Sequence, residues 1–396
     1  MVSRFLTGIR IIDDFLGGGV EKGSSVLLRA NPFVDATPIL QEWLYNRLRK
    51  GDKGIYCVNN RPRDIVVEEM GSYGWPVGPF KEKKMLILVD AYSGILKLKS
   101  KESFFVEDPL DSKQINETML KAIGETADRN VTLIFDSLNT LIDQCGTGIL
   151  NEVRDWNKLC MAHDVNSVYA FTEWGYPDEI AATLEKVFDS IIELKALRRI
   201  VASEALTVSK IQKTKAKEKR LFPFRYIKPG GLRIYIPKVL VTGPYHAGKT
   251  TIVHSLSTRA VSVQRMGTTV ALDFGHVDQK GFSLDLFGTI GQARFDPILD
   301  QLGGEAVGVL LVVDSSKPEE FPRAMEMMRK AGVHGLPYVV VANKQDLSGA
   351  LSAEEIREKM HVPPEIDIIP TVATEKENVT RALDALLEKF TGERWE

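Results

Sequence analysis

A glycine-rich stretch in the second half of the sequence carries its strongest chemical signal. Residues 243–250 read Gly-Pro-Tyr-His-Ala-Gly-Lys-Thr and fit the phosphate-loop pattern G-x-x-x-x-G-K-[ST]. Its glycines allow the backbone to wrap a phosphate with successive N–H groups pointing inward. We expect Lys249 to supply positive charge to the β- and γ-phosphates and the Thr250 hydroxyl to bind Mg²⁺. The residues expected to contact the nucleotide here are Gly243, Pro244, Tyr245, His246, Ala247, Gly248, Lys249, Thr250 and Thr251.

A second polar motif predicts which base is bound. Asn343-Lys344-Gln345-Asp346 ends an apolar run, "YVVVANKQDL". The Asp346 carboxylate can accept hydrogen bonds from both N1 and N2 of guanine, whereas adenine has no matching pair of donors. Asn343 is expected to brace the loop, and Lys344 to lie along the base. A polar turn after a strand is the alternative, but the upstream phosphate loop favours a guanine site.

The elements that must position these motifs are strands alternating with helices. Apolar runs at 24–30, 53–59, 84–91, 130–137 and 165–172 predict strands in the first half. Further runs at 237–243, 268–275, 282–288, 307–314, 337–344 and 366–373 predict strands in the second half. Residues 36–51 predict a helix closed by Gly51. The pattern predicts an α/β fold with mainly parallel sheets and two nucleotide-fold-like halves.

Length and composition also predict two domains. A chain of 396 residues exceeds one ordinary core, and we place the join near Ile236–Pro237, giving domains 1–236 and 237–396. The net charge of −2 implies no global attraction to nucleic acid or to an anionic membrane. The scattered residues Cys57, Cys145 and Cys160 fit a reducing cytoplasm and show no metal-binding spacing. We find no signal peptide or apolar membrane span and expect any membrane contact to occur through a partner.

The second domain resembles a small GTPase of the Ras superfamily, especially the prokaryotic branch that includes the polarity switch MglA. The resemblance rests on the phosphate loop and the Asn-Lys-Gln-Asp motif, and it implies a GTP/GDP switch with Mg²⁺ and two mobile loops. It assigns the closing contact with Mg²⁺ and the γ-phosphate to Thr268 or Thr269. It assigns γ-phosphate sensing to Gly291 and orientation of the attacking water to Gln292. It also places backbone contacts to guanine at Ala373-Thr374.

One position departs from this family pattern. The family motif D-x-x-G-Q is here Gly288-Thr-Ile-Gly-Gln, so the aspartate that holds Mg²⁺ through water is a glycine. Asp285 lies an odd number of residues upstream and should face the other side of a regular strand. Asp273, expected on the neighbouring strand, is the preferred substitute, although its direction depends on a hairpin register. A literal D-x-x-G from Asp285 to Gly288 ranks lower because it displaces Gln292, and an ordinary turn is the remaining alternative.

The first domain resembles the KaiC-like ATPases of the RecA superfamily. The residues that carry this resemblance are "TGIRIID", Gly17-Gly18-Gly19, "KGS" at 22–24 and the strand "NVTLIFDS" ending at Asp136 and Ser137. The resemblance spans roughly residues 3–235. Together the two halves therefore predict two P-loop NTPase-type domains, a RecA/KaiC-like domain followed by a small-GTPase-like domain.

The first domain lacks the chemistry that its resemblance implies. The family phosphate loop falls on residues 30–37, Ala-Asn-Pro-Phe-Val-Asp-Ala-Thr, with Ala36 at the lysine position and Asp35 beside the place of phosphate. The family pair of catalytic glutamates falls on Asn60-Arg61, which leaves no general base. We expect a pseudo-ATPase in which Asp136 is structural. The alternative is an unorthodox anion site supported by Arg61 or Arg63.

Three hypotheses follow. The preferred one is a cytoplasmic, prokaryotic (archaeal or bacterial) GTPase switch with slow hydrolysis, fused to an inactive scaffold or regulatory domain. The others are a non-hydrolysing GTP-binding assembly protein and, less favoured, a DNA-dependent ATPase, supported only by the basic run at 210–220. Expected partners are guanine nucleotide, a GTPase-activating partner, a roadblock/longin-type regulator suggested by the resemblance, and a second copy bound through the RecA-like domain.

Overall fold

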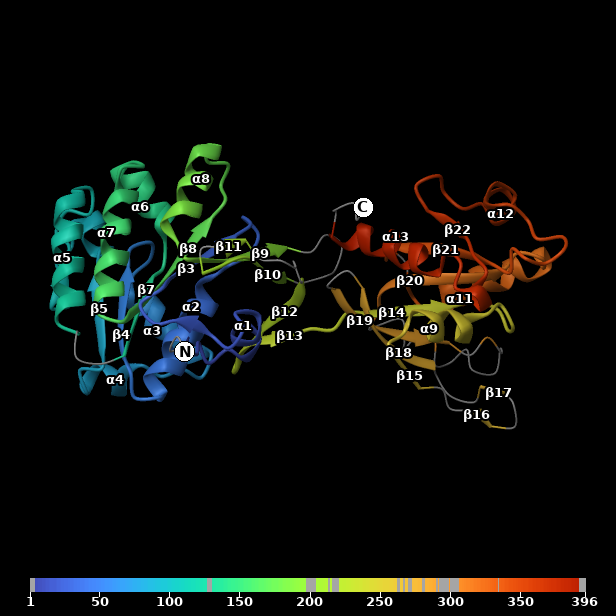
Figure 1. Cartoon of the computed structure of the whole chain (residues 1–396), viewed down its shortest axis with the longest axis horizontal. Coiled ribbons are helices and arrows are strands. Elements are labelled where there is room, and N and C mark those ends of the chain that lie inside the picture. Colours follow the sequence, from blue (N-terminus) through green and yellow to red (C-terminus); the bar gives the residue numbers. More distant parts are fainter. Residues whose placement is uncertain are drawn as a thin grey trace. The chain divides into compact units, whose positions relative to one another are not determined.

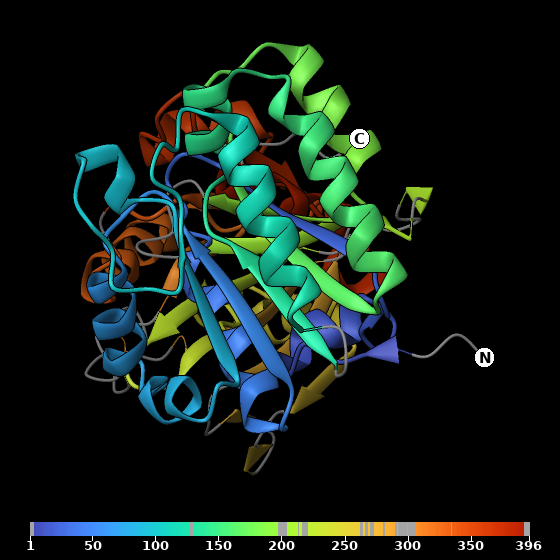
Figure 2. The ribbon, with the colours of Figure 1, turned by 90° about the vertical axis from the view of Figure 1, so that its left-hand side faces the viewer.

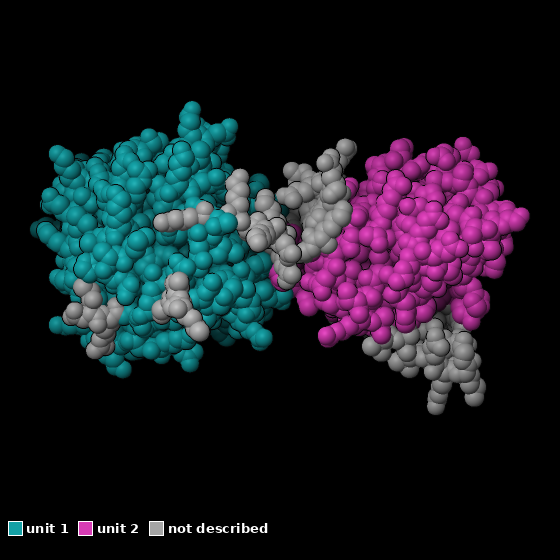
Figure 3. Space-filling view, in the orientation of Figure 1, with its two compact units in different colours: residues 1–196, 204–220, 224–234 teal, residues 197–203, 221–223, 235–396 magenta. Residues whose placement is uncertain are grey.

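The chain forms two compact units, coloured separately in Figure 3. The computed structural model describes residues 4–126, 130–196, 204–212, 214–215, 221–261, 264–265, 268–269, 273–279, 282–289, 291, 299, 306–333 and 335–391. The first unit comprises Met1–Ala196, Glu204–Arg220 and Phe224–Ile234, and the second comprises Leu197–Ser203, Leu221–Pro223 and Tyr235–Glu396. Among the described residues, no helix combines the length and apolar character needed to cross a membrane.

The first unit is built on a large mixed sheet. Its strands are β3 (Ser25–Ala30), β4 (Lys53–Val58), β5 (Leu86–Asp90), β6 (Phe104–Phe105), β7 (Val131–Phe135), β8 (Val165–Thr172), β9 (Ser190–Ala196), β10 (Glu204–Ile211), β11 (Thr214–Lys215), β12 (Phe222–Ile227) and β13 (Gly231–Ile234). The order is β13-β12-β10-β9-β3-β8-β7-β4-β5-β6, and the stretch from β9 to β6 is parallel. A small separate hairpin pairs β1 (Arg4–Phe5) with β2 (Val20–Glu21). The strand predictions for the first half are confirmed.

Helices cover both faces of this sheet (Figures 1 and 2). They are α1 (Arg10–Phe15), α2 (Thr37–Arg49), α3 (Arg63–Ser72), α4 (Gly78–Glu82), α5 (Ser112–Gly124), α6 (Leu138–Cys145), α7 (Ile149–Ala162) and α8 (Asp178–Val187). Helices α5 to α8 share one core cluster with the strands, in which Trp156 stacks on Phe135. On the other face α2 buries Trp43 completely. The predicted helix at 36–51 is α2, and Gly51 follows it with a positive φ of 92°.

The second unit has a seven-stranded sheet. Its strands are β14 (Lys238–Thr242), β15 (Arg259–Val261), β18 (Asp273–Gln279), β19 (Phe282–Gly288), β20 (Ala306–Asp314), β21 (Tyr338–Asn343) and β22 (Ile368–Pro370), with a separate hairpin of β16 (Gln264–Arg265) and β17 (Thr268–Thr269). The order is β15-β18-β19-β14-β20-β21-β22, parallel from β19 to β22. The strand predicted at 268–275 corresponds to β17 and the start of β18.

Alternating side chains of β20 divide the core of the second unit between two helix layers. The helices are α9 (Lys249–Leu256), α11 (Phe321–Lys330), α12 (Ala353–Met360) and α13 (Val379–Thr391). Val309, Leu311 and Val313 pack towards α11 and α12. Helices α9 and α13 pack against each other and the sheet. This parallel sheet brings the loops after β14, β20 and β21 to one edge, where α/β sheets bind ligands.

Candidate functional site

The loop between β14 and α9 has the backbone conformation of a phosphate cradle. Gly243 has a φ of 148° and Gly248 a φ of 102°, values that L side chains rarely adopt. A Cβ on Gly243 would collide with the Val312 carbonyl oxygen, and one on Gly248 would collide with Nδ2 of Asn343. His246 also has positive φ, 64°, and its ring lies against that of Tyr245. The loop therefore depends on both glycines, and Lys249 to Thr251 form the first turn of α9.

Lys249 is buried at the base of this loop. Its Nζ donates a 2.6 Å hydrogen bond to the carbonyl oxygen of Pro244. Burial lowers the pKa of Lys249 to about 8, although the negative charges of Asp273 and Glu320 act in the opposite direction. A phosphate placed in the loop would stabilise the charged form of this amine.

Thr250 and Asp273 meet beside the loop. The Thr250 hydroxyl, on α9, donates a 2.5 Å hydrogen bond to Oδ2 of Asp273, at the start of β18. Asp273 is buried, and the structure thus places a hydroxyl and a carboxylate oxygen side by side. Hard oxygen donors of this kind suit Mg²⁺.

The hairpin of β18 and β19 explains how Asp273 reaches this position. Asp273 pairs directly with Gly288 across the antiparallel ladder, and a Cβ on Gly288 would lie 2.8 Å from Cβ of Asp273. Asp285 points elsewhere, because its Oδ1 lies 2.8 Å from Nδ1 of His276. The register that the sequence left open thus directs Asp273, and not Asp285, towards Thr250.

Asn343 joins the base-recognition motif to the phosphate loop. Its Nδ2 donates a 2.9 Å hydrogen bond to the carbonyl oxygen of Ala247, and its Oδ1 accepts one of 3.0 Å from the backbone N–H of Ala373. Ala373 is the first residue of the short 3₁₀ helix η4 (Ala373–Glu375), and Thr374, its second residue, is exposed. One buried amide thus connects the phosphate loop to the two segments from which guanine contacts are expected.

The other residues of the motif divide between anchoring and exposure. Nε2 of Gln345 donates to Oγ of Ser315 at 2.8 Å and to the Leu351 carbonyl, which fastens the loop inward. Lys344 Nζ donates to Oδ2 of Asp314 at 2.6 Å. Asp346 is exposed at the surface. The motif therefore presents one carboxylate outward from a loop held on both sides.

The predicted switch residues are only partly described. Gly291 is buried against the phosphate loop, where a Cβ would collide with the backbone nitrogen of Tyr245. Thr268 and Thr269 form β17, paired with β16. Gln292 lies outside the described residues, so its predicted role stays a prediction.

Two acidic residues at this edge were missed by the sequence reasoning. Asp314 ends β20, and although burial alone raises its pKa, hydrogen bonds from Lys344 and Ser316 outweigh burial and lower the pKa. Glu320, directly before α11, acts electrostatically on Lys249, and its Oε2 is buried without a hydrogen-bond partner among the described residues. The position of Asp314 at the carboxyl end of a buried strand could have identified it.

In the first unit, several backbone N–H groups of the loop at 30–37 donate hydrogen bonds to residues of the loop itself. The N–H of Phe33 donates to Oδ1 of Asn31 at 3.1 Å, and that of Val34 donates to the Asn31 carbonyl at 2.9 Å. Oδ1 of Asp35 accepts from the N–H of Thr37 at 2.9 Å, at the first residue of α2. A carboxylate thus occupies the helix N-terminus at which other α/β proteins bind phosphate.

Arg61 fills the space beside this loop. Its Nη2 lies 3.0 Å from Oγ1 of Thr37, and its Nη1 pairs with Glu69 at 3.2 Å. Thr37 occupies the position at which a phosphate loop uses a hydroxyl to bind Mg²⁺. A guanidinium group therefore contacts the hydroxyl that a metal would contact in an active ATPase.

Asp136, at the carboxyl end of β7, is buried near the same guanidinium. Burial raises the pKa of Asp136 to about 7, although Arg61 and the backbone N–H of Asn59 act to lower it. In the part of the chain that the structure describes, Oδ2 of Asp136 has no hydrogen-bond partner. This carboxyl group is thus poorly solvated and only weakly paired.

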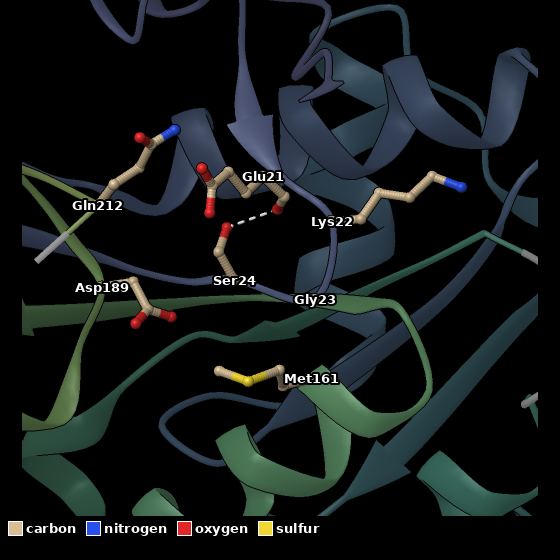
Figure 4. A pocket seen from close by; sticks show the side chains of 7 residues that line it. All are labelled: Glu21, Lys22, Gly23, Ser24, Met161, Asp189 and Gln212. Atoms are coloured by element: carbon tan, nitrogen blue, oxygen red, sulfur yellow. Dashed lines mark hydrogen bonds between the residues drawn. The ribbon is translucent and has the colours of Figure 1, made fainter. Parts of the chain in front are cut away.

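A separate pocket of about 190 Å³ opens at the amino-terminal ends of strands of the first sheet (Figure 4). It is lined by Glu21, Lys22, Gly23, Ser24, Met161, Asp189 and Gln212. Ser24 Oγ donates to the Glu21 carbonyl oxygen at 2.7 Å, and Asp189 accepts from Ser25. The pocket lies by the amino ends of β3 and β9, away from the edge where α/β sheets bind ligands.

Family models match both halves of the chain. The model described as "ATPase: KaiC" matches residues 5–239, and that described as "ADP-ribosylation factor family" matches residues 235–390. A UPF0273 protein of Pyrococcus horikoshii is 35% identical over 142 residues, which cover 36% of this chain and 57% of the relative. The ADP-ribosylation factor-related protein 1 of Rattus norvegicus is 32% identical over 129 residues, covering 30% of this chain and 64% of the relative. The chain thus spans less than two thirds of either curated relative.

Among solved structures, a KaiC-like protein of Pyrococcus horikoshii OT3 aligns with 59% of this chain and with its own whole length. The TM-score is 0.48 and the sequence identity 16%.

Proposed function

We propose that the chain, which belongs to the KaiC family of ATPases through residues 5–239 and matches the ADP-ribosylation factor family at 235–390, is a guanine-nucleotide switch. Its KaiC-like domain is proposed to be catalytically inactive. In this proposal the second unit binds and slowly hydrolyses GTP. The first unit serves as a scaffold or regulatory module.

The bridge formed by Asn343 is the observation that carries this proposal. A single amide connects the phosphate loop at Ala247, the base-recognition loop and the backbone N–H of Ala373. A nucleotide with its phosphates in the loop at 243–250 would therefore have its base near Asp346. That carboxylate can accept from the two guanine donors, which favours GTP and GDP over ATP.

The residues present fit a Mg²⁺ ion with the nucleotide. Thr250 and Asp273 supply neighbouring oxygen donors, and we assign the metal site to these two with Thr268 or Thr269. When bound, Mg²⁺ would offset the negative charge of the β- and γ-phosphates. Lys249 would hold the same phosphates by direct charge, and the glycine cradle would orient them.

Hydrolysis is proposed to be slow without a partner. Gln292 would orient the water and Gly291 would contact the γ-phosphate, as the family resemblance implies. GTPases of this type without an arginine finger turn over at about 10⁻⁴ to 10⁻³ s⁻¹. We therefore propose a GTPase-activating partner, for which a roadblock/longin-type protein is one candidate.

The contacts of the first unit support its inactivity. The Asp35 carboxylate accepts from the first backbone N–H of α2 at the place of a phosphate, and Arg61 contacts Thr37 at the place of a metal. Asn60 and Arg61 also stand where the family has its catalytic glutamates, so no general base is provided. Such a unit can still offer its surface for self-association or for an effector.

A non-hydrolysing GTP-binding assembly protein is the second candidate. The glycine at 288 favours it, because the metal carboxylate now comes from β18 instead of the strand that leads to Gln292. Tight GTP binding with no turnover, even with a cell extract as a source of activating partner, would support this candidate over the first.

Titration calorimetry of the purified chain with GTP, GDP and ATP, each with Mg²⁺, tests the proposed function. We expect one guanine-nucleotide site per chain and no heat from ATP. An ATP site, or a second guanine site, would show that the first unit still binds nucleotide. In Lys249→Ala all guanine-nucleotide binding should disappear, whereas Lys22→Ala, a lysine of the first unit away from both loops, should bind as the wild type does.

A further inference from the structure

The segment that follows β5 displays an unusual run of exposed side chains. Residues 95–99, Ile-Leu-Lys-Leu-Lys, are all exposed, and the aliphatic side chains of Ile95, Leu96 and Leu98 are 36%, 51% and 57% exposed. The segment follows the carboxyl end of β5, and Figure 2 shows it in cyan standing away from the sheet. Large aliphatic side chains so exposed, one after another, indicate a contact surface.

The base of this loop is firmly held. Asp90, at the end of β5, accepts hydrogen bonds from Ser93 Oγ at 2.7 Å and from Ser100 Oγ at 2.6 Å. One carboxylate therefore ties the start of the loop to its end. A Cβ on Gly94 would collide with the Val106 carbonyl oxygen, so the turn packs closely on the chain that returns from the tip. The exposed tip thus projects from a closed, hydrogen-bonded base.

A second anchor, Glu102, holds the segment that returns from the tip of the loop. The Glu102 carboxylate pairs with Arg63, at the start of α3, and with Lys81 of α4 at 2.5 Å. With Glu102 paired in this way, the other charged side chains of residues 95–101 are Lys97, Lys99 and Lys101, and all three are exposed. The exposed acidic residues Glu107 and Asp108 follow on the returning chain, where the Glu107 carbonyl oxygen lies close to Gly94 at the base of the loop. The tip is therefore basic and apolar, although the whole chain has a net charge of −2.

We propose that this loop, residues 95–101, docks the first unit onto an anionic lipid bilayer. Ile95, Leu96 and Leu98 would enter the interfacial zone of the bilayer, and Lys97, Lys99 and Lys101 would contact lipid phosphates. Lysine suits this position because its apolar stem can lie beside the aliphatic side chains while its ammonium group reaches the headgroups. This direct contact differs from the sequence expectation that any membrane association would occur only through a partner.

The shape and spacing favour a bilayer over an acidic protein. The segment that carries the exposed aliphatic side chains stands away from the sheet (Figure 2), whereas a partner protein holds an anchoring side chain best in a pocket. Leucine and lysine alternate over residues 96–99 and all four side chains are exposed, so apolar and basic groups lie close together at the surface. A fluid surface of apolar chains under anionic headgroups matches both kinds of group at once.

Vesicle co-sedimentation of the full chain tests the proposal. The probes are phosphatidylcholine vesicles with about 30% phosphatidylglycerol and vesicles of phosphatidylcholine alone. We expect the wild type to partition about tenfold more strongly onto the anionic vesicles, with salt weakening the binding. The double variant Leu96→Ser/Leu98→Ser should lose about tenfold in partitioning, because the apolar contribution is removed. The variant Lys97→Glu/Lys99→Glu should lose the preference for anionic vesicles.

Met161→Ser is the matched control, because Met161 is 50% exposed but lies at the end of α7, away from the loop. It should partition as the wild type does. Guanine-nucleotide binding and the thermal midpoint, which involve no tip residue, should be unchanged in every variant. The proposal is overturned by a wild type that does not distinguish the two vesicle types, or by a serine double variant that still partitions normally. A wild type that ignores vesicles but binds poly-glutamate would assign the loop to an acidic protein and would also overturn it.

Discussion

Thr250 and Asp273 share a 2.5 Å hydrogen bond between α9 and the first residue of β18. Directly across the ladder from Asp273 stands Gly288. The family resemblance implies an aspartate at this position. A Cβ on Gly288 would lie 2.8 Å from Cβ of Asp273, so the two positions compete for one space. We interpret Asp273 as the replacement for the aspartate of the family pattern. Its carboxylate comes from β18 instead of β19, and its oxygen lies near the Thr250 hydroxyl.

Asp273→Asn should weaken Mg²⁺ binding to the nucleotide complex. Removing the charge while keeping the shape should raise the Mg²⁺ concentration needed for tight nucleotide binding by about tenfold to a hundredfold. The release rate of a fluorescent GDP analogue, followed against free Mg²⁺, measures this. Asp285→Asn on the same hairpin should leave the Mg²⁺ dependence unchanged, and an effect equal to that of Asp273→Asn would contradict the assignment.

Exchanging the two positions gives a second test of the same relationship. Gly288→Asp alone should destabilise the second unit by about 1–3 kcal/mol, because the new side chain crowds Asp273. Asp273→Gly alone should lose the Mg²⁺ dependence. The double variant Asp273→Gly/Gly288→Asp should recover much of both properties, measured by thermal unfolding and by GDP release. Simple addition of the two single defects would argue against a shared space.

Asp346→Asn should reduce the preference for guanine. The amide offers an N–H₂ group to the guanine donors and loses the charge-assisted hydrogen bonds, so GTP affinity should fall by about tenfold to a hundredfold. Displacement of a bound fluorescent GDP analogue by GTP and by ATP measures the preference. Glu354→Gln, another exposed carboxylate in the second unit, should behave as the wild type does. An unchanged preference in Asp346→Asn would remove base recognition from this loop.

Arg61→Ala should destabilise the first unit without giving it nucleotide binding. The substitution removes the contacts to Thr37 and Glu69 and should cost about 1–3 kcal/mol in the free energy of unfolding. Hydrogen exchange of α2 and α3 locates the effect, and Arg10→Ala, a fully solvated arginine of α1, serves as the control. An Arg61→Ala variant as stable as the wild type would contradict a structural role of the guanidinium, and a gain of ATP binding would contradict the prediction that the first unit cannot bind nucleotide.

Asp136→Asn should change how stability depends on pH. The pKa of Asp136 rises from 3.8 to about 7 on folding, so the folded state binds more protons between these values. Its contribution to stability is therefore complete below about pH 4 and is lost as the pH rises through about 7. The asparagine variant lacks this loss and should melt higher than the wild type at pH 8, with a smaller difference at pH 5. Asp155→Asn, on the surface of α7, should show no such pH-dependent difference.

The sequence predicted what depends on short, contiguous segments. The phosphate loop, the motif at 343–346 and the strands that precede them are local patterns, and their positions follow from parallel strands ending at one edge. The direction of Asp273 could not be predicted, because it depends on the register of β18 against β19, set by a hairpin of weak turn chemistry. The partners of Arg61 and Asp35 could not be predicted either, because both residues stand where the family pattern has other residues and no motif describes their contacts. The fold brings Arg61 to the Thr37 side chain, and Asp35 accepts from the Thr37 backbone N–H.

Arg61 has a consequence for how the first unit is made. A metal ion and its nucleotide must be captured from solution, whereas an arginine side chain is synthesised with the polypeptide. With Arg61 at Thr37 and Asp35 at the start of α2, the unit has its counter-charges as soon as translation ends. If the first unit is inactive as proposed, its folding should not depend on nucleotide supply or on chelators, whereas the second unit should respond to both.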